Sequence, residues 1–165
     1  MTERQLEILG AARELLAGEG VEALTVGRLA AVLGIKPPSL YKHFAGKREL
    51  ESHLIADGLR EHAEALEASA GDLASIAAAY RAFALTNPQL YRLMTERPLP
   101  REDLPDGLEA RAAAPLIAAV GGDQDLARAA WAYAHGMVQL ELAGRFPPDA
   151  DLAAAWRKAI AAFSA

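Results

Sequence analysis

The most distinctive chemical feature of the sequence is a cluster of cations near its amino-terminal end. Residues 25–48 contain five Lys or Arg side chains and no Asp or Glu, so this window has a net charge of +5. The whole chain has a formal net charge of −5, and the cluster is therefore a local feature. A basic patch on a compact helical segment is typical of nucleic-acid-binding proteins. The sequence predicts a nucleic-acid-binding head followed by an acidic body.

Residue types that support catalysis or metal binding are sparse in comparison. The chain has no cysteine, which excludes disulfides, thiolate zinc sites and cysteine nucleophiles. The four histidines, His43, His53, His62 and His135, do not follow a metal-binding spacing such as His-Glu-x-x-His. No phosphate-binding loop, nucleophile elbow or paired-carboxylate site occurs. We therefore expect no metal, no cofactor and no enzymatic activity.

Length and composition indicate a globular protein. The 165 residues are 52% hydrophobic and 24% charged, which is enough for one good core or two small modules. No apolar run approaches the roughly 18 residues that span a bilayer, and polar residues follow Met1 without a secretory signal. We expect a cytoplasmic protein that has no membrane segment.

The elements that must position the basic cluster are short helices. Ala, Leu, Arg and Glu dominate every long segment, which predicts an all-α fold of about nine helices. A first helix over residues 2–17, with Leu6 on its apolar face, precedes a second that begins after Thr25, a suitable N-cap. Gly34 permits the tight turn of a helix-turn-helix, and a third helix begins near Pro37 and is broken at Ala45–Gly46.

The body is also predicted to be helical. A fourth helix of about 23 residues begins near Lys47. Apolar positions from Leu73 to Ala84 form a helical face, and a short helix continues it after Asn87–Pro88. Further helices are predicted near residues 108–120, 123–143 and 149–163. The proline-rich residues 97–107 are expected to form a loop. The predicted organisation is a head over residues 1–46 and a regulatory body over residues 47–165.

Residues 24–50 resemble the DNA-binding domain of the TetR family of bacterial transcriptional regulators. The positions that carry this resemblance are Thr25, Leu29, Ala30, Gly34, Ile35, Leu40, Tyr41, His43, Phe44, Lys47 and Leu50. Trp131, His135 and Gly136 match the Trp-x-x-x-His-Gly motif of one subgroup of the family. The resemblance implies a homodimer, by family default a repressor, that binds a palindromic operator in double-stranded DNA and is controlled by a small-molecule effector.

The third helix is then the candidate recognition helix, with its amino-terminal end in the major groove. Lys36, Ser39 and Lys42 can reach base edges or phosphates, and Pro37 can contact a thymine methyl group. The resemblance implies that further contacts to phosphates come from Thr25, Arg28, Tyr41, His43 and Lys47. Lys36 stands where many relatives have a capping Ser or Thr, so we expect a weaker cap on this helix.

Two further sites are expected in the body. Small and large apolar residues on the last two helices suit a four-helix bundle between two copies of the chain; the candidates are Ala127, Ala134, Trp156, Ile160 and Phe163. An apolar pocket with few polar groups suits a hydrophobic or aromatic effector; its candidates are Tyr80, Phe83, Tyr91, Met94, Trp131 and His135. Control by a protein partner, or no ligand at all, remains the alternative.

Overall fold

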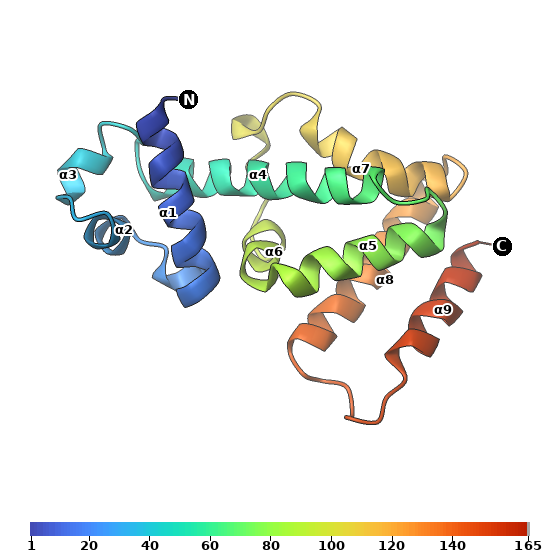
Figure 1. Ribbon diagram of the computed structural model, residues 1–165. Helices are drawn as coiled ribbons and strands as arrows, with labels where there is room; N and C mark the ends of the chain where they lie inside the picture. The colour runs from blue at the N-terminus through green and yellow to red at the C-terminus, as the bar shows by residue number, and fades with distance from the viewer. Residues whose placement is uncertain (165) are drawn as a thin grey trace. The chain divides into compact units, whose positions relative to one another are not determined.

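The computed structural model of the protein describes residues 1–164, and the regular secondary structure in that part of the chain is helical (Figure 1). Its α-helices are α1 (Glu3–Glu19), α2 (Val26–Val32), α3 (Pro37–Leu40), α4 (Lys47–Glu67), α5 (Leu73–Thr86), α6 (Pro88–Thr95), α7 (Leu108–Ala119), α8 (Gln124–Leu142) and α9 (Leu152–Phe163). Two short 3-10 helices, η1 (Val21–Ala23) and η2 (Arg101–Asp103), lie between them. The predicted all-α class with about nine helices is confirmed.

The chain forms two compact units. The first contains Met1–Leu59 and Asn87–Asp106, and the second contains Arg60–Thr86 and the chain from Gly107 onward. The boundary between the units falls inside α4. The first unit therefore contains residues 47–59 and 87–106 in addition to the head over residues 1–46 that the sequence predicted.

Local sequence signals account for the helix starts in the first unit. Thr2 caps α1 in a reciprocal capping box, since its hydroxyl accepts from the Gln5 N–H and the Gln5 side chain accepts from the Thr2 N–H. Thr25 caps α2, and its hydroxyl accepts from the Arg28 N–H at 3.1 Å. Gly34 has φ of 65°, which an L-residue adopts only with strain, and this allows the turn between α2 and α3.

The core of the first unit lies where α1 packs against α2, η1 and α6. Ile8, Leu29 and Phe44 are among its buried side chains. Leu6, which the sequence pattern placed on the buried face of the first helix, is instead 55% exposed, and Ile8 is fully buried. The prediction for Leu6 was wrong because no element in the described part of the chain covers this side chain. The apolar periodicity of α1 extends to Leu6, but the packing does not.

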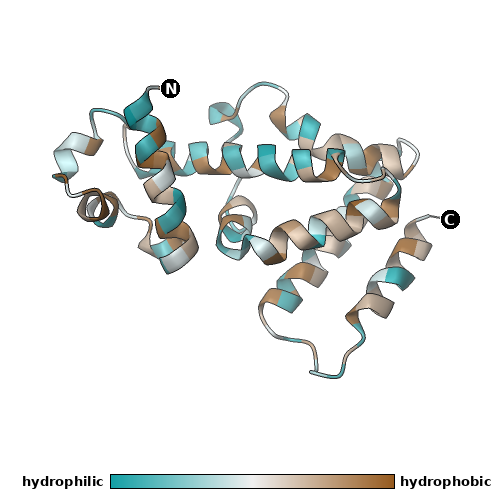
Figure 2. Cartoon of the chain, viewed as in Figure 1, coloured by the Kyte–Doolittle hydropathy of each residue, from teal (hydrophilic) through white to brown (hydrophobic). Residues whose placement is uncertain are grey.

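In the second unit, α5 is the central helix and packs against α7, α8 and α9. Figure 2 shows that hydrophobic residues dominate α5 and α9, whereas hydrophilic and hydrophobic residues alternate along α4. Tyr133 of α8 connects α8 to α9, since its ring lies 6.1 Å from that of Trp156 and 6.0 Å from that of Phe163. No helix among the described residues is long and apolar enough to cross a lipid bilayer.

Candidate nucleic-acid interface

The predicted recognition helix is a single turn. α3 ends at Leu40, and Tyr41–His43 form turns rather than the further helix that the sequence suggested. Lys36 is its N-cap, with extended dihedral angles (φ −84°, ψ 143°) and no side-chain hydrogen bond to the helix. The expected weak cap is therefore observed, and Pro37 supplies a residue that needs no N–H partner at the first helical position.

The side chains around α3 differ in their accessibility. Lys36, Pro37, Pro38 and Lys42 are exposed, whereas Ser39 is half-buried. Neither Lys36 nor Lys42 forms an ion pair within residues 1–164. These two ammonium groups are free to bind phosphates or base edges.

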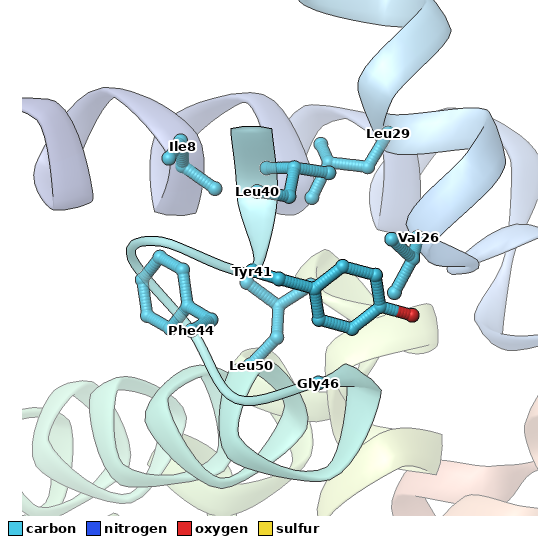
Figure 3. Close-up of a pocket in the computed structure, with 8 residues that line it drawn as sticks. All are labelled: Ile8, Val26, Leu29, Leu40, Tyr41, Phe44, Gly46 and Leu50. Carbon is cyan, nitrogen blue, oxygen red and sulfur yellow. The ribbon is translucent and has the colours of Figure 1, made fainter. Parts of the chain in front are cut away.

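Tyr41 is exposed beside a small apolar hollow in the head. Figure 3 shows its ring next to Val26, with its hydroxyl directed away from the hollow. The side chain is 56% exposed, whereas Phe44 is 4% exposed. Phe44 also packs edge-on against His53, at a ring-centroid distance of 5.6 Å. Phe44 is thus a core residue, and Tyr41 combines a packed ring with a hydroxyl that can reach a polar partner.

Three cations of the basic window are already paired within the chain. The Arg28 guanidinium donates two hydrogen bonds to the Glu19 carboxylate, one of them at 3.0 Å. This pair lowers the pKa of Glu19 and raises the pKa of Arg28. The Lys47 ammonium lies 3.6 Å from the Glu51 carboxylate, and Arg48 contacts Glu102 and Asp103.

The positive charge that the window offers is therefore smaller than its composition suggests. The carboxylates that neutralise it come from α1, from α4 and from the loop at η2, and two of them lie 54 and 55 positions after Arg48. No local sequence signal identifies Glu102 and Asp103 as partners of the head. They are the residues of this region that sequence reasoning missed.

Thr25 and His43 are both engaged in holding the head together. The Thr25 hydroxyl accepts one hydrogen bond as a cap, which leaves its O–H free to donate to an exposed acceptor. The backbone carbonyl of His43 accepts from the Gln5 side chain at 3.0 Å, and this bond ties the turn after α3 to α1. His43 itself is half-buried.

The six effector candidates are distributed over both units. Tyr80 and Phe83 are buried on α5 of the second unit, whereas Tyr91 and Met94 belong to α6 of the first. Trp131 is 50% exposed on α8, and its ring lies 6.2 Å from that of His135 one turn later.

Next to Tyr80 and Phe83 lies a residue that the sequence did not single out for ligand binding. His62 of α4 packs edge-on against both rings, at 5.3 Å and 5.1 Å. Its Nε2 atom is buried and has no hydrogen-bond partner among the described residues. Within residues 1–164, no three His, Asp or Glu side chains form a group that could hold a metal ion.

The candidate dimer residues are mostly turned inward. Ala127 and Trp156 are 5% and 7% exposed, and Ala134, Ile160 and Phe163 are half-buried. The outer face of α8 is formed by small residues at helical spacing, Ala129, Ala132 and Gly136, followed by Leu140, which is 45% exposed. A Cβ added at Gly136 would meet no atom of another element within 4 Å among the described residues, so this face is open there.

Comparison with known proteins gives consistent results for both parts of the chain. Residues 8–53 match the family model described as bacterial regulatory proteins, tetR family, and residues 73–163 match the tetracyclin repressor-like C-terminal domain. The chain is 33% identical over 151 residues to the uncharacterized HTH-type transcriptional regulator Rv0681 of Mycobacterium tuberculosis (strain ATCC 25618 / H37Rv), covering 83% of this chain and 69% of that protein.

Two further similarities differ in how much of each protein they cover. The HTH-type transcriptional regulator YobS of Bacillus subtilis (strain 168), also uncharacterized, is 34% identical over 93 residues, which are 53% of this chain and 49% of YobS. This chain therefore aligns with about half of that relative. The crystal structure of the regulatory protein SCO4313 superposes with a TM-score of 0.77 at 30% identity, covering 98% of this chain and 95% of that one.

Proposed function

Because the chain belongs to the TetR family of bacterial regulatory proteins, we propose that this transcriptional regulator is a homodimeric repressor. It binds a near-palindromic operator through two copies of the head and leaves the operator when a small apolar or aromatic effector binds the body. Members of this family are DNA-binding transcription factors rather than enzymes, which agrees with the expectation from sequence. Such a regulator acts in the cytoplasm, where bacterial DNA lies.

One observation carries the DNA-binding proposal: within residues 1–164, the two lysines that flank α3 form no ion pair with a carboxylate. Lys36 and Lys42 are exposed at the two ends of a one-turn helix that begins with Pro37 and Pro38. Proline side chains can contact thymine methyl groups, and lysines can reach guanine edges or phosphates. We assign DNA contacts to these residues together with Thr25, Arg28, Ser39, Tyr41, His43 and Lys47.

We place the dimer contact on the outer face of α8. Ala129, Ala132 and Gly136 permit close approach of a second helix, and Leu140 adds an exposed apolar side chain. Ala127 and Trp156 are buried within their own chain, so they support this surface from behind. Trp131 also belongs to α8 and is half-exposed, and a second chain bound to this face would cover its ring. The Trp131-x-x-x-His135-Gly136 motif would then mark a domain of the Trp-x-x-x-His-Gly type.

The effector site is proposed around Tyr80 and Phe83, which are buried one turn apart on the central helix of the second unit. Aromatic walls with few polar groups favour an apolar or aromatic ligand. A ligand that binds one arrangement of α4 better than another shifts the spacing of the two heads and weakens operator binding.

Selection from random double-stranded DNA with the full-length chain tests the proposal. The expected product is a near-palindrome, protected in a footprint over half-sites about one or more helical turns apart. Enrichment of asymmetric sites would contradict a twofold dimer, and no enrichment at moderate salt would contradict sequence-specific binding. Mapping the selected sites onto the source genome would then suggest the chemistry of the effector.

A further inference from the structure

The side chain of His62 has an unsatisfied polar atom inside an apolar cluster. Its Nε2 is shielded from solvent and has no hydrogen-bond partner in the described part of the chain, whereas the large majority of such groups in folded proteins are paired. The rings of Tyr80 and Phe83 pack edge-on against the imidazole ring, at interplanar angles of 81° and 67°. An unpaired buried nitrogen destabilises a protein, so its presence requires a compensating role.

We propose that His62 is the polar recognition residue of the effector site, and that the ligand is an uncharged aromatic ring carrying a hydroxyl group. This proposal rests on the proposed function and deepens it by naming the ligand class. The edges and faces of Tyr80 and Phe83 form the walls against which the ligand ring packs, and Nε2 pairs with its hydroxyl. The site lies within the second unit, between α4 and α5.

A hydroxyl group on the ligand suits the neutral imidazole of His62 better than a charged group does. A neutral imidazole nitrogen is a donor in one tautomer and an acceptor in the other, and a hydroxyl pairs with either. A charged ligand is disfavoured, because the burial that shields Nε2 also lowers the pKa of His62 to about 4 and thus penalises charge at this position. The imidazole is therefore neutral at pH 7.

The backbone of α5 approaches α7, α8 and α9 closely. The contact between α4 and α5 at His62 is instead made by aromatic side chains. A planar ligand entering between His62 and the two rings would replace ring–ring contacts by ring–ligand contacts of the same kind. The hydrogen bond to Nε2 is then the only new polar interaction, and it determines which aromatic compounds are retained.

The other buried unpaired nitrogen among the described residues, Nε1 of Trp156, also lies beside an edge-on aromatic ring. Its ring meets that of Tyr133 at 88°, an arrangement in which an indole N–H can point at a ring face. If the faces of Tyr80 or Phe83 served Nε2 of His62 in the same way, replacing His62 by Phe would lower the stability.

The test compares His62→Phe with a matched control, His53→Phe. His53 lies on the same helix and also packs edge-on against an aromatic ring, that of Phe44, but it has no buried unpaired nitrogen. Without ligand, His62→Phe is expected to raise the Tm of the full chain by about 2–6 °C, because an unsatisfied polar atom is removed. His53→Phe is expected not to raise it.

The second measurement uses phenol and toluene as probes in calorimetric titrations of the full chain. Wild type and His53→Phe are expected to bind phenol about three- to tenfold more tightly than toluene, and His62→Phe is expected to lose this preference. A lower Tm for His62→Phe, an unchanged preference in that variant, or no phenol binding to wild type would each overturn the inference. Operator binding by unliganded wild type is measured separately, so a failure of the proposed DNA-binding function is distinguished from a failure of this inference.

Discussion

Arg48, in the first turn of α4, is paired with Glu102, which lies 54 positions further along the chain. Asp103 reinforces the contact, since one of its carboxylate oxygens lies 3.4 Å from Arg48 Nε and accepts a hydrogen bond from the Ser52 hydroxyl at 3.0 Å. A separate ion pair joins Arg97 to Glu51 of α4 at 2.8 Å. The acidic loop at η2 thus lies against the amino-terminal end of α4, and we expect it to compete with DNA phosphates for Arg48.

Removing this competition should strengthen DNA binding. Glu102→Gln removes one of the two carboxylates that pair with Arg48 and leaves Asp103. We expect affinity for operator DNA to rise about two- to fivefold at low salt, since exposed pairs of this kind contribute at most about 1 kcal/mol. Fluorescence anisotropy with labelled DNA measures the change. Adding Arg48→Ala should abolish it, and an equal gain in the absence of Arg48 would contradict a role for the pair.

The two lysines of the DNA-binding surface should differ in what they contribute. Lys42→Ala is expected to weaken operator binding by about tenfold or more while affecting non-specific DNA less, as for a group that reaches base edges. Lys47→Ala should weaken specific and non-specific binding alike and reduce the salt dependence, as for a phosphate contact. Lys158→Ala, on the exposed surface of α9, is the control and should change neither. Unchanged affinity for both head variants at moderate salt would remove the assignment.

Gly58 marks a close approach between α4 and α6 in the first unit. A Cβ at this position would lie 2.6 Å from the Met94 sulfur and 3.1 Å from Leu90. Gly58→Ala should therefore lower the free energy of unfolding by about 1–2 kcal/mol, because overpacking outweighs the gain in helix propensity. Gly10→Ala on α1, where a Cβ meets nothing within 4 Å, should raise it by about 1 kcal/mol. Urea denaturation measures both, and equal stabilisation by the two variants would show that α6 yields freely.

The outer face of α8 can be tested by a charge. Ala132 is exposed between Ala129 and Gly136, and Ala132→Asp would place a carboxylate in the proposed twofold contact. We expect sedimentation to show a shift from dimer to monomer at micromolar concentration, with unchanged helix content by circular dichroism. Ala74→Asp, at an exposed position of α5, should leave the dimer intact. A dimer that tolerates Ala132→Asp would place the contact elsewhere.

The stability should also fall in mild acid in a way that depends on His62. Burial lowers its pKa in the folded chain from 6.5 to about 4, so the unfolded chain binds the proton first as the pH falls. The free energy of unfolding is therefore highest above pH 6.5 and falls progressively towards pH 4. Protonation of His62 in the unfolded chain lowers it by about 2 kcal/mol between pH 7 and pH 5. Denaturant unfolding of wild type should show this loss, and His62→Phe should lack that part of it. Parallel pH profiles for the two proteins would argue against a buried neutral imidazole.

Local features of the chain were predictable because they depend on neighbouring residues. Thr25 caps a helix through a hydroxyl that reaches an amide three residues away, Gly34 permits a turn, and Pro37 starts a helix whose first N–H needs no partner. The family signature of the head depends on the same short spacings. The order of the helices and the basic character of residues 25–48 therefore follow from the sequence alone, whereas the end of α3 at Leu40 does not.

The tertiary structure decided which charged and aromatic side chains are available to bind a partner. Arg48 forms an ion pair with Glu102, which lies far from it in the sequence. The Nε2 atom of His62 is buried without a hydrogen-bond partner among the described residues, because α5 packs against it. Leu6 and Ala127 show the same limit, since apolar periodicity gives a face but not the element that covers it. Burial and pairing arise from contacts between segments, so only the folded chain determines which groups of a motif can act.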